Sequence, residues 1–219
     1  MTRRIAVYLE VTRKRTFVGA VEWPGWCRSG KTPEDALEAL VAYADRYAAV
    51  ISRSRLGFER PSTVGDLEVV ERLTGNATTE FGAPGVAPKA DSRRVAAAEL
   101  KRLTAILEAS WRAFDRTAKE ARGVTLSKGP RGGGRDLPKM REHVLGAEES
   151  YLVALGSRRP TEPGTLRSTI RGALVARSRD EQVADPNKVT KRWSPRYFVR
   201  RAVWHTLDHA WEIEDRSGS

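Results

Sequence analysis

Two short stretches near the start of the chain alternate between apolar and polar side chains. They cover residues 5–11 (IAVYLEV) and 16–22 (TFVGAVE), with the polar residues 13–15 (RKR) between them. Alternation with a period of two is typical of strands that bury one face, so the pattern predicts a β-hairpin. The Pro-Gly pair at residues 24–25 then interrupts the second strand.

A helix is predicted over residues 33–52. Thr32 is suited to cap its first turn, and Pro33 is suited to its first position. A further strand is predicted over residues 67–73. Apolar side chains of the helix recur at spacings of three and four, so that one face can cover the hairpin; they are Ala36, Leu37, Leu40, Val41, Ala44, Tyr47 and Ala48.

The composition changes over residues 76–92, where two prolines and two glycines stand among small and polar residues. We expect neither a helix nor a strand to continue through this stretch, and we place the domain linker at residues 83–91. The chain before it, residues 1–82, is predicted to be a small α+β module.

The rest of the chain has helical periodicity. Apolar residues at spacings of three and four predict helices over residues 92–121, 137–155, 165–179 and 195–215. Four helices make a bundle the simplest architecture. The predicted fold class is therefore an α+β N-terminal module, a β-hairpin plus helix, followed by an all-α four-helix bundle over residues 92–219.

The positive charge is concentrated in the predicted bundle. The chain has 219 residues and a net charge of +11; residues 1–88 hold 12 Lys and Arg against 11 Asp and Glu, which leaves +10 for the remainder. A solvated helical surface explains such charge, and nucleic acid or another polyanion is an alternative partner that we do not favour.

Cysteine usage and hydropathy exclude several classes of protein. Cys27 is the single cysteine, so the chain has no internal disulfide framework and no zinc site of the Cys-x-x-Cys kind. No apolar run is long enough to cross a membrane, and residues 1–14 do not resemble a signal peptide, so we expect a cytoplasmic protein. Any metal would need nitrogen and oxygen ligands.

The chain has three histidines, and their spacing suggests a metal site. His205 and His209 are four residues apart on the last predicted helix, so both imidazoles project from one face. His143 stands near the start of the second predicted helix. If these helices face each other, three imidazoles can bind one ion and leave other coordination positions open. The alternative is that all three histidines are packing residues.

These residues resemble a family. The segment 204–214 (WHTLDHAWEIE) is similar to the last-helix motif of DinB-like metal-binding four-helix bundles, and His143 matches the histidine that those proteins carry on their second helix. The resemblance implies His143, His205 and His209 as ligands of a divalent transition metal such as zinc or nickel. Imidazole donors suit zinc, nickel, copper and iron alike.

The same resemblance implies an activity. DinB-like proteins of known activity are thiol-dependent transferases and isomerases, in which the metal activates a low-molecular-weight thiol. It also implies a small-molecule substrate and a homodimer. We further hypothesise that Arg201 binds a carboxylate of the ligand and that Glu212 orients an imidazole or a bound water, the alternative for each being an ion pair. Asp208 is expected to face away from the histidines.

The N-terminal module has a separate resemblance. Residues 17–22, the turn at 24–30 (PGWCRSG) and the helix start at 32–37 are similar to the strand, Pro-Gly-Cys turn and helix of HicB-like antitoxin domains. The chain departs from those antitoxins because a bundle follows where they carry a DNA-binding segment. We interpret the module as an accessory for ligand sensing or dimerisation, and an antitoxin-like regulator with a protein partner remains an alternative.

Overall fold

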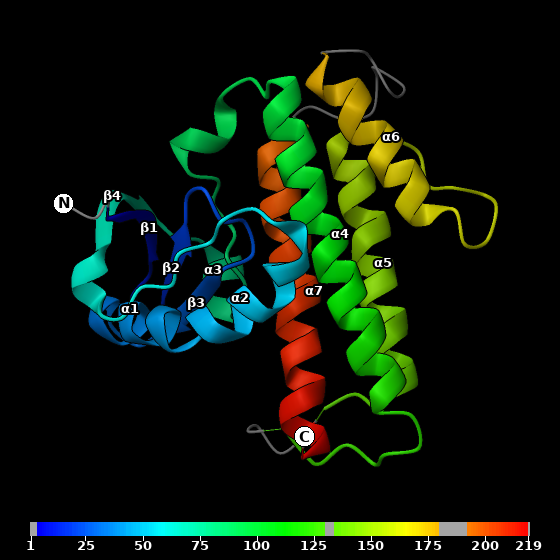
Figure 1. The fold of residues 1–219 in the computed structure, drawn as a ribbon, viewed down its shortest axis with the longest axis horizontal. Coiled ribbons are helices and arrows are strands. Elements are labelled where there is room, and N and C mark those ends of the chain that lie inside the picture. Colours follow the sequence, from blue (N-terminus) through cyan, green and yellow to red (C-terminus); the bar gives the residue numbers. More distant parts are fainter. Residues whose placement is uncertain (1–3, 130–133, 180–191, 219) are drawn as a thin grey trace. The chain divides into compact units, whose positions relative to one another are not determined.

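The computed structural model describes residues 4–129, 134–179 and 192–218. Its contacts divide the chain into two compact units, Met1–Arg93 and Arg94–Ser219. The first unit is a mixed sheet with helices, and the second is a bundle of four helices (Figure 1). The predicted fold class is confirmed.

The N-terminal unit is built on a four-stranded sheet in the order β3-β2-β1-β4. The predicted hairpin is present as β1 (Ile5–Val11) and β2 (Thr16–Ala20), which pair antiparallel. The predicted third strand is β4 (Leu67–Thr74), and it runs parallel to β1. The strand β3 (Cys27–Gly30), which extends the hairpin on its other edge, was not predicted.

The single helix expected after the hairpin is two helices. Thr32 caps α1 (Pro33–Ala42), as expected, and a second helix, α2 (Ala44–Ile51), follows directly. The break falls at Tyr43, whose backbone leaves the helical region with φ −94° and ψ 4°. A 3₁₀ turn, Ser52–Ser54, closes the segment, so helical structure ends close to where the apolar periodicity ends.

The proline- and glycine-containing stretch is more ordered than expected. It holds a five-residue helix, α3 (Ala77–Phe81), and a 3₁₀ turn at Lys89–Ser92. The Asn76 side chain accepts hydrogen bonds from two amides of the first turn of α3, which explains why so short a helix forms there. The helix ends at Phe81 with Gly82 as its C-cap, before the first proline of the stretch.

The C-terminal unit consists of α4 (Ala97–Glu120), α5 (Leu137–Leu155), α6 (Leu166–Ser178) and α7 (Pro195–Ser217). Helix α7 packs against α4 and α5, and the shorter α6 lies across them (Figure 1). No helix among the described residues is long and apolar enough to cross a membrane. The largest fully buried side chains of the unit are Ile106, Leu107, Met140, Leu152, Leu155, Ile170 and Phe198.

Candidate metal centre

Local sequence signals fix the two helices that carry the histidines. Asp136 caps α5 by accepting a hydrogen bond from an amide of the first turn, and Ser194 caps α7 in the same way. His143 lies in the second turn of α5, and His205 and His209 lie one turn apart on α7. Packing of α5 against α7 brings the three imidazoles together.

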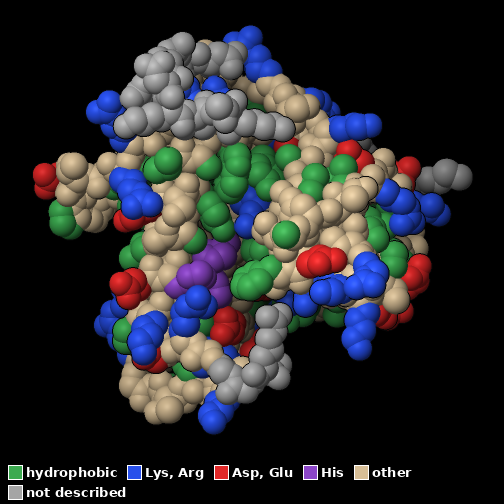
Figure 2. Space-filling model, turned by 180° about the vertical axis from the view of Figure 1, so that it is seen from behind, with side chains coloured by type: hydrophobic (Ala, Val, Ile, Leu, Met, Phe, Trp, Pro, Cys, Tyr) green, Lys and Arg blue, Asp and Glu red, His purple; other side chains and the backbone are tan. Residues whose placement is uncertain are grey.

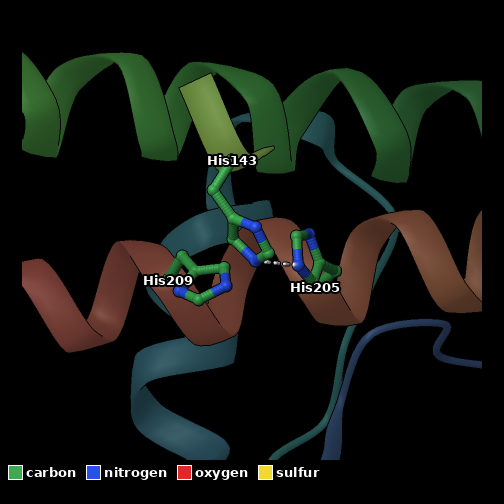
Figure 3. Close-up of side chains that lie close together, drawn as sticks. All are labelled: His143, His205 and His209. Carbon is green, nitrogen blue, oxygen red and sulfur yellow. Dashed lines mark hydrogen bonds between the residues drawn. The ribbon is translucent and has the colours of Figure 1, made fainter. Parts of the chain in front are cut away.

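The three histidines form one cluster. One ring nitrogen of each lies within 4.8 Å of the ring nitrogens of the other two. His205 Nε2 is 3.1 Å from His143 Nε2, and the three ring centroids are 4.6 to 4.9 Å apart (Figure 3). His143 and His209 are half-buried and His205 is buried. Histidine atoms of the cluster are visible at the molecular surface (Figure 2). The cluster is therefore a partly open group of three potential ligands.

A carboxylate fixes the orientation of His209. Glu212 lies one turn further along α7, and its Oε2 is 2.9 Å from His209 Nδ1. Because an ionised carboxylate only accepts, Nδ1 donates the hydrogen, and Nε2 is left with a free lone pair. The hydrogen bond from His209 holds the pKa of Glu212 below its usual value. Arg216 binds the other oxygen, Oε1, through Nη1 at 2.9 Å.

His205 has no comparable support. Its side chain is buried, and its Nδ1 has no hydrogen-bond partner among the described residues. Burial is the main cause that lowers the pKa of both His143 and His205, and the neighbouring His209 adds to it in both cases. Both rings are therefore neutral near pH 7, and a neutral imidazole is the form that binds a metal.

The donor set fits a divalent transition metal. Two imidazole nitrogens bound to one tetrahedral zinc ion are about 3.3 Å apart, given Zn–N bonds of about 2.0 to 2.1 Å. The His143 and His205 nitrogens, at 3.1 Å, are already near that separation. A histidine that binds a metal through one ring nitrogen commonly donates a hydrogen bond from the other ring nitrogen to a carboxylate, as His209 does to Glu212.

Arg201 lies beside the cluster and is buried. Its guanidinium lies 5.1 Å from the centre of the Trp204 ring and 5.6 Å from that of Tyr151, and Nη2 is 3.4 Å from the Tyr151 hydroxyl. The Tyr151 ring also contacts His205 edge-on, with centroids 5.9 Å apart. Arg201 therefore adjoins the histidines through aromatic neighbours. Asp208 is not part of the histidine cluster.

Glu148 is a buried ionisable residue that the sequence analysis missed. It is fully buried in α5; Oε1 accepts hydrogen bonds from Trp111 Nε1 at 2.6 Å and Thr206 Oγ1 at 3.4 Å, whereas Oε2 has no described partner. Burial raises its pKa to about 7. A signal was present in the sequence, because Glu148 is four residues from both Val144 and Leu152 on the buried face of α5.

Comparisons with protein-family models, with curated proteins and with solved structures found no match to this chain.

Proposed function

We propose that the C-terminal bundle binds a divalent transition metal through His143, His205 and His209, and that the protein is a DinB-like, thiol-dependent transferase or a related enzyme. The observation that carries the proposal is the convergence of three imidazoles from two helices, one of them oriented by a carboxylate. Zinc and nickel are the ions that we favour.

The chemistry follows from a site with three protein ligands. A divalent ion held there would lower the pKa of a bound thiol or water and would supply a nucleophile near neutral pH. In this proposal Glu212 accepts the Nδ1 hydrogen of His209 and keeps its Nε2 lone pair free. Arg201, buried beside His205, binds a carboxylate of the small-molecule ligand.

Elemental analysis of the protein, purified without an affinity tag, tests metal binding. We expect near-stoichiometric zinc, nickel or a similar ion in the wild type, and its loss in the double variant His205→Ala, His209→Ala. Asp208→Asn, on the same helix, is the control and keeps its metal. The milder variant His143→Gln covers the case in which the double variant fails to fold. Absence of metal after reconstitution would overturn the proposal.

A second experiment tests the thiol. The metal is replaced by cobalt, and low-molecular-weight thiols are titrated into the protein. A thiolate-to-cobalt absorption band that saturates, and that is absent from His143→Gln, supports thiol binding at the site. If the cobalt protein forms no such band with any thiol, the transferase assignment fails while metal binding stands.

For the N-terminal unit we propose an accessory role of the HicB-like kind. Support comes from its order of hairpin, turn and capped helix. Ligand sensing and dimerisation are the two forms of that role, and sedimentation of the full chain at several concentrations distinguishes a dimer from a monomer.

A further inference from the structure

The bundle contains a pocket beside the histidine cluster. It lies between the segment that follows α4, the first turns of α5 and the end of α7, and its volume is about 650 Å³. Sites for small molecules in proteins have this size. Arg141, which lines the pocket, is two residues from His143 in the sequence.

The lining of the pocket is strongly basic. Arg122, Lys128, Arg141 and Arg216 contribute to it, and Asp136 is its one acidic residue among those described. The Asp136 carboxylate is already engaged, because it caps α5 and lies 3.3 Å from a lysine in the first turn. Within the described part of the chain, Arg122, Lys128 and Arg141 form no ion pair with an acidic side chain. Their charge is therefore available to an anionic ligand.

Arg216 is held in place with one guanidinium nitrogen, Nη2, left over. The side chain is only 6% exposed; Nε donates to the Ser127 carbonyl at 2.7 Å, and Nη1 donates to Glu212. Nη2 has no partner among the described residues. Gly134 lies directly against the guanidinium, since a Cβ added there would be 2.6 Å from Nη2. A glycine at this position, with φ +138°, lets the backbone approach the guanidinium that closely.

The remaining wall of the pocket is apolar. Leu126 and Leu137 line it and also pack against the buried core of the bundle. Val124 and Pro138 extend this wall. A ligand that matches both parts of the lining has an anionic group and an apolar body, and such a ligand gains from charge-assisted hydrogen bonds and from burial of its apolar surface.

We propose that this pocket binds a small organic acid, with its carboxylate among Arg122, Lys128, Arg141 and Arg216 and its apolar body against Leu126 and Leu137. The binding needs no metal, so the proposal goes beyond the function proposed above. Glu212 connects the pocket to the histidine cluster, because one of its oxygens binds Arg216, which lines the pocket, and the other binds His209. An acid bound to Arg216 is therefore connected through the Glu212 carboxylate to His209, a proposed ligand of the metal.

Calorimetric titration of the chelator-treated full chain at low ionic strength tests the proposal. Benzoate is the probe for a carboxylate with an apolar body, acetate for the carboxylate alone, and inorganic phosphate for an anion without an apolar part. The double variant Lys128→Gln, Arg141→Gln removes two of the pocket charges. Lys101→Gln, Arg158→Gln removes the same net charge at exposed positions outside the pocket lining.

We expect wild-type protein and the control pair to bind benzoate more tightly than acetate or phosphate. Affinity for benzoate should fall at least about tenfold in the pocket variant, which is the effect of losing one charge-assisted hydrogen bond. Gly134→Ala, which keeps every charge but crowds Arg216, should also weaken binding. Absence of benzoate binding, an equal loss in the control pair, or phosphate binding as tight as that of benzoate would overturn the proposal.

Discussion

Among the described residues, each unit of the molecule buries one glutamate completely, and the two carboxylates differ in their hydrogen bonds. In the N-terminal unit, Glu10 accepts hydrogen bonds from the Thr79 hydroxyl, the Gly85 amide and the Val86 amide, so both of its oxygens are used. In the bundle, Glu148 uses only Oε1, and its other oxygen has no described partner. The two carboxylates are therefore equally buried, but Glu10 has more hydrogen bonds than Glu148 to offset the cost of burial.

The hydrogen bonds of the two carboxylates indicate different roles for them. Backbone amides that surround a carboxylate tie a loop to a strand, which is a structural role, and Glu10 on β1 holds the chain after α3 in this way. In the bundle, Glu148 Oε2 and His205 Nδ1 are buried and have no hydrogen-bond partner among the described residues. Such atoms cost folding free energy, and they concentrate at functional sites. One of these atoms, His205 Nδ1, belongs to a residue of the histidine cluster.

The largest expected effect is stabilisation of the bundle by metal. An ion at a concentration 1,000 times its dissociation constant stabilises the folded state by about 4 kcal/mol. Hydrogen exchange should show this gain in the amides of α5 and α7 and leave β1 unchanged. His143→Gln is the control and should abolish the gain. A gain spread equally over both units would contradict the assignment of the site to the bundle.

The next effect is the pH dependence that Glu148 confers. Its pKa rises from 4.5 to about 7 on folding. Its contribution to the free energy of unfolding is therefore complete below about pH 4.5 and is lost as the pH rises through 7. The loss is about 3 kcal/mol. Glu148→Gln cannot ionise, so its stability relative to the wild type should increase by about this amount between about pH 4.5 and pH 8.5.

Urea unfolding at the two pH values measures this difference. The control is Glu149→Gln, which removes a carboxylate from the half-buried neighbouring position. If the wild type and Glu148→Gln lose stability in parallel as the pH rises, Glu148 ionises in the core without cost, and the contrast with Glu10 disappears.

The same substitution at Glu10 should have the opposite sign. Glu10→Gln places an amide NH₂ where a carboxylate oxygen now accepts backbone hydrogen bonds, so at least one half-buried backbone amide loses its partner. We expect the N-terminal unit to lose about 2 kcal/mol near neutral pH. Unfolding monitored by hydrogen exchange in β1 measures the loss, and the exposed position Glu59→Gln should stay within about 0.5 kcal/mol of the wild type. A neutral Glu10→Gln would mean that the loop closes without this carboxylate.

Sequence reasoning found the helices of the bundle because their signals are local. Helix α5 begins and ends where it was predicted, since Asp136 caps its start and Gly156 adopts the left-handed conformation at its end. The pair on α7 follows from helical spacing. His143 was added from its place on the second predicted helix, and the family resemblance supported it. Sequence signals that lie within one or two helical turns of each other can be recognised from a single sequence.

What could not be predicted depends on partners that are distant in sequence. Glu10 is 75 residues from the Gly85 amide that it binds, and Glu148 is 37 residues from Trp111. The parallel pairing of β4 with β1 and the strand β3 likewise depend on tertiary packing rather than on local propensity. The break between α1 and α2 has no proline or glycine to mark it.

The smallest effect compares two histidines within the cluster, His209, which a carboxylate supports, and His205, which none supports. Glu212→Gln replaces the carboxylate that accepts from His209 Nδ1 by a neutral carbonyl, so the imidazole becomes a weaker donor to the ion. We expect metal affinity to fall roughly tenfold, or about 1.4 kcal/mol, with stoichiometry unchanged. Competition with a chromophoric chelator measures the affinity. Glu214→Gln removes the same charge from α7 at a carboxylate that binds Thr117, so it should leave the affinity intact. An unchanged affinity in Glu212→Gln would show that packing alone orients His209, as it must orient His205.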